Sequence, residues 1–374
     1  MRLAFITNRP THYRAPIFRQ LAQRHEVDFF FTATSPGRWW APQQAVDYPE
    51  LRGHYEGAAT LYHELMRRRY AVVVCSLGGR SHFAATALAV ARSRVPLVLW
   101  VDMWFYPRSS VHAVGRPLTR HLLRRADALV SCGPHVTRWI AEEAGRTHAI
   151  YEMPNAVAND HFARPVSSEQ LSQFRVGYGL DGVTASYVGR LEPEKGLDVL
   201  LRAVAASRES FDVVLAGQGS LRKPLADLSE ALGIADRVRF LGWLEQQRLP
   251  VLYQASDVFV FPSVSTRLVK ETWGLAVNEA MSAGLPVIAT DAVGAAAGGL
   301  VEDGVTGWVV PERSVRALSR ALDQAVSNRQ TREARGKEAR RRASTYTFEA
   351  GAEAFEAALE HAVTARGRLV QGAV

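Results

Sequence analysis

The sequence predicts an α/β protein with two doubly wound parallel-sheet domains. Its 374 residues are too many for one average hydrophobic core, and 47% of them are apolar, as in fully globular chains. Short β-branched or aromatic runs alternate with helical segments, which is typical of parallel sheets covered by helices. The alternation starts again after Pro154 and Asn155, so we expect a second sheet. Sheets of this kind bind ligands beyond the carboxyl ends of their strands.

Strand-like and helix-like segments alternate through the first half of the chain. Their composition predicts strands at 3–7, 27–32, 72–76, 96–101, 128–132 and 149–151. Helical periodicity predicts helices at 14–23, 81–94, 116–125 and 134–144. We therefore expect a parallel sheet with helices on both of its faces.

The second half repeats this alternation. Its strands are expected at 184–188, 212–216, 237–241, 258–261, 287–290 and 308–310. Its helices are expected at 196–207, 221–232, 246–254, 275–283 and 314–327, and a terminal helix is expected at 349–363. The chain shows no internal sequence repeat of the kind that solenoid proteins carry.

Cysteine usage and hydropathy predict a cytoplasmic protein. Cys75 and Cys132 each end an apolar run, so we expect buried, reduced thiols with no disulfide or metal site. The chain enters a strand at residue 3 without the charged and then apolar pattern of a signal peptide. No apolar run reaches the roughly 18 residues that a membrane span needs.

The formal net charge of +8 is concentrated in the first part of the chain. Residues 1–160 carry 20 Arg against 12 Asp and Glu, whereas residues 161–374 carry 25 basic and 25 acidic side chains. This asymmetry favours an anionic partner for the first domain, such as a phospholipid surface, a lipid-diphosphate carrier or an acidic glycan. The alternative is compositional bias, because Arg outnumbers Lys 41 to 4.

A basic amphipathic helix at 116–125 and the pair Trp39 and Trp40 would suit docking on a membrane surface. A Leu stripe that faces the core, with solvated Arg side chains around it, explains the helix equally well. We therefore expect peripheral membrane contact, at the inner face of the membrane, as one use of the basic first domain.

Two glutamates eight residues apart flank a loop that opens a helix. Glu271 precedes the expected turn at Trp273 and Gly274, and Glu279 lies inside the helix that begins at Leu275. A helix N-terminus offers N–H groups to anionic or hydroxyl-rich ligands, and both carboxylates can accept hydrogen bonds from a polyol. The pattern favours a sugar-nucleotide site. Its alternative is two solvated carboxylates at helix ends.

This pattern resembles the paired-glutamate motif of family 4 retaining glycosyltransferases with the GT-B fold, and the resemblance spans roughly residues 150–345. It implies two Rossmann-like domains that face a central cleft. The implied acceptor-binding domain is 1–165, and the implied nucleotide-sugar domain is 166–348. Residues 349–374 would hold a helix that crosses back to the first domain.

A second motif carries two cations between a strand and a helix. Arg190 follows the strand, and Lys195 stands next to Gly196, where the helix is expected to start. Cations beside a helix start suit a diphosphate, and a surface salt bridge with Glu192 and Glu194 is the alternative.

The resemblance gives these donor-side residues roles. Glu271, together with the backbone of Trp273, Gly274 and Leu275, would bind the donor sugar, and Glu279 would bind the ribose. Arg190 and Lys195 would bind the diphosphate. With the helix dipole they would stabilise its charge as it leaves, so we expect no metal ion and no cofactor. The nucleoside diphosphate sugar is the donor substrate. The sequence has no Asp-x-Asp pair, the form in which the other common transferase fold holds its ion.

Gly217 and Gly219 form a Gly-x-Gly at the end of a strand. By itself this pattern is a weak signal. Arg222 stands where a dinucleotide-binding fingerprint would have its third Gly, which argues against NAD. By the family resemblance, the loop lies close to the donor phosphates.

Loops of the first domain offer residues for the acceptor. The loop after the first strand contains Arg9, His12 and Arg14, where many members of the family carry a Gly-Gly turn. These side chains would bind acceptor or donor phosphate, and helix capping by Thr11 with plain solvation is the alternative. His82 follows Gly78 and Gly79 at the start of a helix, where a lone His is often merely exposed.

Asp102 and Trp104 follow a buried strand and are expected to project into the cleft. Asp102 stands near the place where members of the family often have a His-Asp pair beside the reacting sugar. Without the His, its role as a proton acceptor or orienting group is a hypothesis.

The sequence as a whole predicts a retaining glycosyltransferase that moves a sugar from a nucleoside diphosphate sugar to an acceptor hydroxyl. The expected context is the biosynthesis of a polysaccharide, lipopolysaccharide or other glycoconjugate. The acceptor would be a glycan, lipid-linked or a small molecule, and no nucleic acid partner is expected. A sugar-nucleotide epimerase of the same architecture and a non-catalytic subunit that recruits a partner to the membrane are the alternatives.

Overall fold

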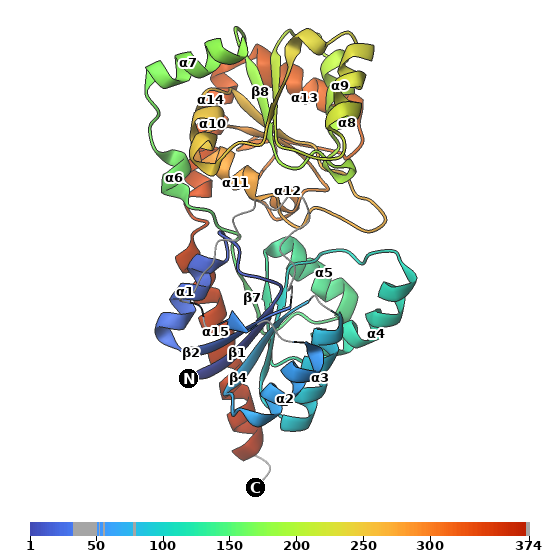
Figure 1. Ribbon diagram of the computed structural model, residues 1–374, viewed down its shortest axis with the longest axis vertical. Coiled ribbons are helices and arrows are strands. Elements are labelled where there is room, and N and C mark those ends of the chain that lie inside the picture. Colours follow the sequence, from blue (N-terminus) through green and yellow to red (C-terminus); the bar gives the residue numbers. More distant parts are fainter. Residues whose placement is uncertain (33–50, 52, 55–56, 78–79, 372–374) are drawn as a thin grey trace. The chain divides into compact units, whose positions relative to one another are not determined.

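The computed structural model describes residues 1–32, 51, 53–54, 57–77 and 80–371, without the side chains of 80 and 367–371. Trp39, Trp40 and the Gly78-Gly79 turn lie outside the described residues. The chain divides into two compact units (Figure 1). Unit 1 comprises Met1–Asn155 and Thr347–Val374, and unit 2 comprises Ala156–Tyr346.

Unit 1 is built on a parallel sheet in the order β3-β2-β1-β4-β5-β6-β7. Its strands are β1 (Arg2–Thr7), β2 (Glu26–Phe31), β3 (Gly53–His54), β4 (Val72–Ser76), β5 (Leu97–Val101), β6 (Ala128–Ser131) and β7 (Ile150–Glu152). Because all are parallel, their carboxyl ends, and the loops that follow them, lie at one edge of the sheet.

Helices cover the unit 1 sheet. They are α1 (Ala15–Arg24), α2 (Ala58–Arg67), α3 (Arg80–Ser93), α4 (Ser110–Arg125), α5 (Pro134–Ala144) and the terminal α15 (Phe348–Gln371). Phe355 of α15 is fully buried, and its ring lies 5.5 Å from the ring of Phe5 on β1 and 5.5 Å from that of Trp100 on β5. The last helix of the chain is thus part of the hydrophobic core of unit 1.

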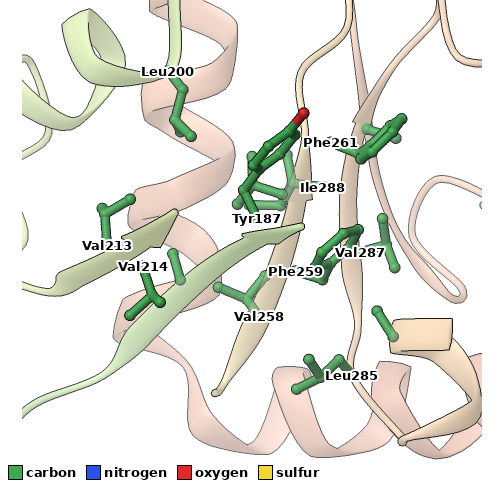
Figure 2. Close-up of a cluster of buried hydrophobic side chains, with 14 of the residues drawn as sticks. Tyr187, Leu200, Val213, Val214, Val258, Phe259, Phe261, Leu285, Val287 and Ile288 are labelled. Carbon is green, nitrogen blue, oxygen red and sulfur yellow. The ribbon is translucent and has the colours of Figure 1, made fainter. Parts of the chain in front are cut away.

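Unit 2 has a parallel sheet in the order β10-β9-β8-β11-β12-β13. Its strands are β8 (Thr184–Val188), β9 (Asp212–Ala216), β10 (Val238–Gly242), β11 (Val258–Phe261), β12 (Val287–Thr290) and β13 (Gly307–Val310). Figure 2 shows a cluster of buried hydrophobic side chains in this unit, among them Tyr187 of β8 and Phe261 of β11. The rings of these two residues are nearly parallel, with centroids 5.8 Å apart.

The sheet of unit 2 is accompanied by helices, several of them short. The helices of this unit are α6 (Asn159–Ala163), α7 (Ser168–Tyr178), α8 (Leu197–Ala205), α9 (Arg222–Ala231), α10 (Leu249–Gln254), α11 (Leu275–Ser282), α12 (Gly294–Ala297), α13 (Val315–Ser327) and α14 (Arg329–Ala343). No described helix combines the length and the hydropathy that crossing a bilayer requires.

The structure confirms the predicted fold class, and the predicted strands agree with it to within about two residues at each end. The predictions missed helices α2, α6, α7, α12 and α14 and the short strand β3, and α4 begins at Ser110 rather than at 116. Helix α14 packs through small residues: a Cβ on Gly336 would lie 2.2 Å from the carbonyl oxygen of Gly284. A contact face of Gly and Ala carries little hydropathy signal, so its helical period is hard to detect.

Candidate functional site

The loops after β8, β9 and β11 meet at the carboxyl edge of the unit 2 sheet, because these strands are neighbours. Gly217 and Gly219 let the first two loops approach each other. A Cβ on Gly217 would lie 1.8 Å from the carbonyl oxygen of Gly189, and one on Gly219 would lie 2.1 Å from that of Leu191. The Gly-x-Gly of β9 is therefore explained by close backbone packing against the β8 loop.

Lys195 and Glu271 form an ion pair at this edge. Both side chains are largely buried, and Ser263 Oγ also donates to Glu271 Oε2 at 3.2 Å. The ammonium lies 5.3 Å from the centre of the Phe261 ring. A buried ammonium and a buried carboxylate compensate each other, whereas either one alone would be costly. The structure thus brings together two residues that the sequence singled out in separate motifs.

Backbone geometry fixes where Lys195 stands. A short 3₁₀ turn, Pro193–Lys195, ends at Gly196, whose φ of 63° is left-handed. A Cβ there would lie 2.2 Å from the carbonyl oxygen of Pro262, so the position requires glycine. The connection from β8 to α8 is in this way packed against the residues that follow β11.

Arg190 lies on the same connection. Its Nη2 donates to Glu194 Oε1 at 2.6 Å, and its carbonyl oxygen accepts from the hydroxyl of Tyr187 at 2.7 Å. Glu192 turns the other way and accepts from the backbone N–H and the hydroxyl of Ser220. Of the two carboxylates considered as salt-bridge partners, Glu194 is the one that pairs with Arg190.

Helix α11 begins where the predicted turn ends. Gly274 has φ 95°, and a Cβ there would lie 2.7 Å from Cε1 of Phe261. Trp273 is buried, and its indole N–H donates to Asn278 Oδ1 at 2.7 Å. The helix starts at Leu275, so the N–H groups of its first turn project from its N-terminus.

Glu279 lies inside α11 and is only 9% exposed. The hydroxyl of Tyr253, on α10, donates to its Oε2 at 2.7 Å. Burial raises the pKa of Glu279 to about 7, and the hydrogen bond from Tyr253 partly opposes that rise. The two glutamates therefore have different surroundings, because Glu271 faces an ammonium and Glu279 faces a neutral phenol. Within the described residues, no group of three or more His, Cys, Asp and Glu is arranged to hold a metal ion.

In unit 1, the loops after β1 and β5 meet through Arg14 and Asp102. Arg14 Nη2 donates to Asp102 Oδ2 at 3.3 Å, and its Nη1 donates to Asn8 Oδ1 at 2.6 Å. The guanidinium also lies 4.5 Å from the centre of the Trp100 ring. Burial raises the pKa of Asp102, and the charge of Arg14 opposes that rise.

Other predicted acceptor residues of unit 1 also follow its strands. The backbone N–H of Arg9 donates to Asn8 Oδ1 at 2.8 Å. His12 is exposed, and its ring lies edge-on to that of Tyr13, with centroids 5.2 Å apart. His82 lies in α3, where its carbonyl oxygen accepts from Thr86 at 2.8 Å. Trp104 lies edge-on to the buried His135 at 5.1 Å.

Sequence reasoning did not single out Asn8, His135 or Tyr253 as site residues. Asn8 follows a strand end directly, and His135 lies in the first turn of α5, just after β6. Both residues could therefore have been recognised from the sequence, because they follow predicted strands closely. Tyr253 had no such signal, because it lies in α10 and does not follow the end of a strand directly.

The predicted basic helix is part of α4, and its arginines are not simply solvated. Arg116 donates to both carboxylate oxygens of Glu143 at 2.7 Å and lowers the pKa of that carboxyl. Arg120 Nε and Arg124 Nε donate to the carbonyl oxygens of Glu143 and Ala144, each at 2.9 Å. These bonds cap the C-terminus of α5, where cations also interact favourably with the helix dipole.

A second face of α4 is apolar and exposed. Val111, Val114 and Leu118 are 50%, 82% and 39% exposed, and their spacing places them on one side of the helix. Beside them lies a groove of about 460 Å³, whose lining includes Pro117, His121 and the arginines 116, 120 and 124. The exposed surface of α4 therefore combines an apolar stripe with a basic groove.

Comparisons with known proteins indicate the family and the fold of this chain. The family model for glycosyl transferases group 1 matches residues 173–342. The D-inositol 3-phosphate glycosyltransferase of Streptomyces scabiei (strain 87.22) is 33% identical over 352 residues, which cover 81% of this chain and 75% of that protein. The alpha-D-kanosaminyltransferase of Streptomyces kanamyceticus is 29% identical over 255 residues, which cover 64% of this chain and 63% of that protein.

Two solved structures are similar in fold. HepE of Anabaena, in complex with UDP and glucose, has a TM-score of 0.75 at 19% identity, over 95% of this chain and 98% of that one. The sucrose-phosphate synthase of Thermosynechococcus elongatus has a TM-score of 0.68 at 20% identity, over 99% of this chain and 98% of that one. These likenesses confirm the expected GT-B fold class.

Proposed function

Because this chain belongs to the group 1 glycosyl transferases, we propose that it moves a sugar from a nucleoside diphosphate donor to an acceptor hydroxyl with retention of configuration. The observation that carries the proposal is the buried ion pair of Lys195 and Glu271. Glu271 shortly precedes the N-terminus of α11, and Glu279 lies within that helix. We assign the chain to family 4 on this motif.

The donor would lie along the carboxyl edge of the unit 2 sheet. Arg190 and Lys195 would bind the diphosphate, near the loop of Gly217 and Gly219. Glu271 and the backbone of Trp273, Gly274 and Leu275 would bind the sugar, and Glu279 would bind the ribose. Support comes from the convergence of β8, β9 and β11 at this edge and from the N–H groups that α11 presents.

Transfer would then proceed on one face of the sugar. The bond from the anomeric carbon to the diphosphate breaks, and a bond to the acceptor oxygen forms on the same side. The acceptor proton passes to the departing phosphate oxygen. Arg190, Lys195 and the N-terminus of α11 would stabilise the negative charge that develops on the diphosphate, in place of a divalent ion.

The acceptor would bind to the proposed domain 1–165, and 166–348 would be the donor domain. The proposed acceptor-binding residues are Arg9, His12, Arg14, His82 and Trp104. Asp102 would orient the reacting groups. Several relatives are named for D-inositol 3-phosphate, a small phosphorylated polyol, and the guanidinium groups of Arg9 and Arg14 suit such an acceptor as well as a lipid-linked glycan. The product would serve glycoconjugate biosynthesis.

We also propose that α4 brings the protein to an anionic bilayer on the cytoplasmic side. The apolar stripe of Val111, Val114 and Leu118 would enter the interface, and the basic groove beside it would face lipid phosphates.

The proposal is tested by incubating the protein with UDP-, GDP-, dTDP- and ADP-sugars in thermal-shift assays, with EDTA present. A donor should raise the Tm of the wild type by mass action, and Arg190→Ala and Glu279→Ala should lose that shift. NMR of the transfer product would then show whether the anomeric configuration is kept. Epimerised sugar formed without acceptor would favour the epimerase, and no shift with any sugar nucleotide would overturn the transferase proposal.

A further inference from the structure

Tyr253 and Glu279 form a hydrogen-bonded pair inside unit 2. Tyr253 is fully buried, and the rings of Phe162 and Phe259 pack edge-on against it at 6.1 Å and 5.7 Å. Its hydroxyl lies 2.7 Å from Oε2 of the buried Glu279. The packed ring leaves the hydroxyl little freedom, so the position of one carboxylate oxygen is fixed from the core side.

Packing alone does not explain this pair. Val277, Ala280 and Met281, which flank Glu279 on α11, are apolar and buried. The buried polar side chains of the same helix, Asn278 and Ser282, bond to Trp273 and Asn159. A carboxylate among them is costly to desolvate, and a phenylalanine at 253 would fill the same space without a polar atom. Among the described residues, burial and Tyr253 are the influences on the pKa of Glu279, and the phenol is the one that favours the ionised form.

We infer that Tyr253 is a positioning residue for the nucleotide: it holds Glu279 Oε2, so that Oε1 accepts hydrogen bonds from the ribose hydroxyls. The inference rests on the proposed function, in which Glu279 binds the ribose. A carboxylate that is already oriented loses less side-chain entropy when a diol binds, and an ionised oxygen is the stronger acceptor. Tyr253 itself does not touch the nucleotide.

The inference is tested by the preference of the protein for ribose over 2′-deoxyribose. UDP, GDP and ADP are each compared with their 2′-deoxy counterparts by calorimetry, and the base that binds the wild type best is used. We expect the wild type to prefer ribose by about tenfold, as for a hydrogen bond to a charged group. Tyr253→Phe should bring this preference close to one while the affinity for the deoxynucleotide changes little.

A matched control comes from unit 1, where the buried Tyr70 also donates to a carboxylate, that of Asp28, at 2.9 Å. Tyr70→Phe should lower the Tm and leave the ribose preference intact. The comparison of Glu279→Gln with Y253F/E279Q repeats the test without a buried charge, so a folding defect of Y253F alone does not hide the effect. E279Q should keep part of the preference, and the double variant should lose it.

An unchanged ribose preference in Y253F, or an equal loss of affinity for both nucleotides, would overturn the inference and leave the proposed function standing. If Glu279→Ala keeps the full preference, or if no nucleotide binds the wild type, the ribose role of Glu279 fails first. The two failures are therefore distinguishable.

Discussion

Lys195 and Glu271 are 76 residues apart in the chain and meet as a buried ion pair at the carboxyl edge of the unit 2 sheet. Each is proposed to bind a different part of the donor, Lys195 the diphosphate and Glu271 the sugar. The pair lets both charges stay buried before a donor arrives, because each compensates the other. A donor diphosphate would then add a second anion to an ammonium that is already in place.

Removing one partner of this pair should destabilise the fold by about 3–5 kcal/mol, because the other is left as an uncompensated buried charge. Lys195→Met and Glu271→Gln should therefore each lower the Tm. The double variant K195M/E271Q should regain much of the lost stability, since it buries no charge, yet show no sugar transfer. Thermal unfolding and product formation measure the two effects, and transfer by the double variant would refute the assigned roles.

Gly274→Ala should impair donor binding more than Gly284→Ala, although both positions have left-handed backbone, with φ of 95° and 94°. A Cβ at 274 would clash with Phe261 at 2.7 Å, whereas one at 284 meets nothing within 4 Å. We expect both variants to lose about 1 kcal/mol of stability or more from backbone strain. Only G274A should also weaken the affinity for a sugar nucleotide, measured by calorimetry.

The fold was largely predictable because strands leave a strong local signal. Apolar runs such as Val258–Phe261 are buried on both faces of the sheet, so their composition alone identifies them. Helices that pack through small residues were missed for the opposite reason: the face of α14 holds Gly336, Ala339 and Ala343, which hydropathy hardly separates from the exposed face.

The site was predictable only as separate motifs. Strand ends and a helix start single out Arg190, Lys195 and Glu271 one by one, since each follows from local geometry. Lys195 meets Glu271 because β8 and β11 are neighbours in the sheet. The order of the strands along the sequence does not reveal this pairing. Tyr253 acts through a contact between two helices, so nothing near it in the sequence marks it.

Binding of a sugar nucleotide should weaken as the pH falls below about 7, where the Glu279 carboxyl becomes protonated. Its pKa in the folded protein lies above the unfolded value, so its burial costs stability that is absent at low pH and grows as the pH rises toward 7. Glu279→Gln should therefore gain stability relative to the wild type by up to about 1.4 kcal/mol per pH unit across this window. Calorimetry with a sugar nucleotide, whose phosphates do not titrate there, should show a flat pH profile for E279Q.

The exposed stripe of α4 should be needed for binding to anionic vesicles. Val114→Asp/Leu118→Asp places two carboxylates in the apolar stripe, so sedimentation with phosphatidylglycerol-rich vesicles should fall strongly. Val176→Asp on α7 is the control, because Val176, at 78%, is about as exposed as Val114 but lies in unit 2. Vesicles of phosphatidylcholine alone should bind neither the wild type nor the variants. Equal sedimentation of V114D/L118D and the wild type would remove α4 from the membrane proposal.

Arg14 and Asp102 should matter for the acceptor and not for the donor. The pair joins the loops after β1 and β5 in unit 1, whereas the proposed donor residues lie in unit 2. Asp102→Asn keeps the shape of the side chain and removes its charge, and we expect kcat/KM for the acceptor to fall roughly 100-fold, as for a misplaced reacting group. Because the pair is partly exposed, its loss should cost about 1 kcal/mol of stability or less.

Arg2→Gln is the control, since Arg2 pairs with Asp28 at the opposite end of β1 and its substitution should leave transfer unchanged. Steady-state kinetics with varied acceptor, together with donor affinity by calorimetry, separate the two sites. A parallel loss of donor affinity in D102N would place this pair outside the acceptor site and would require a different partner for the acceptor hydroxyl.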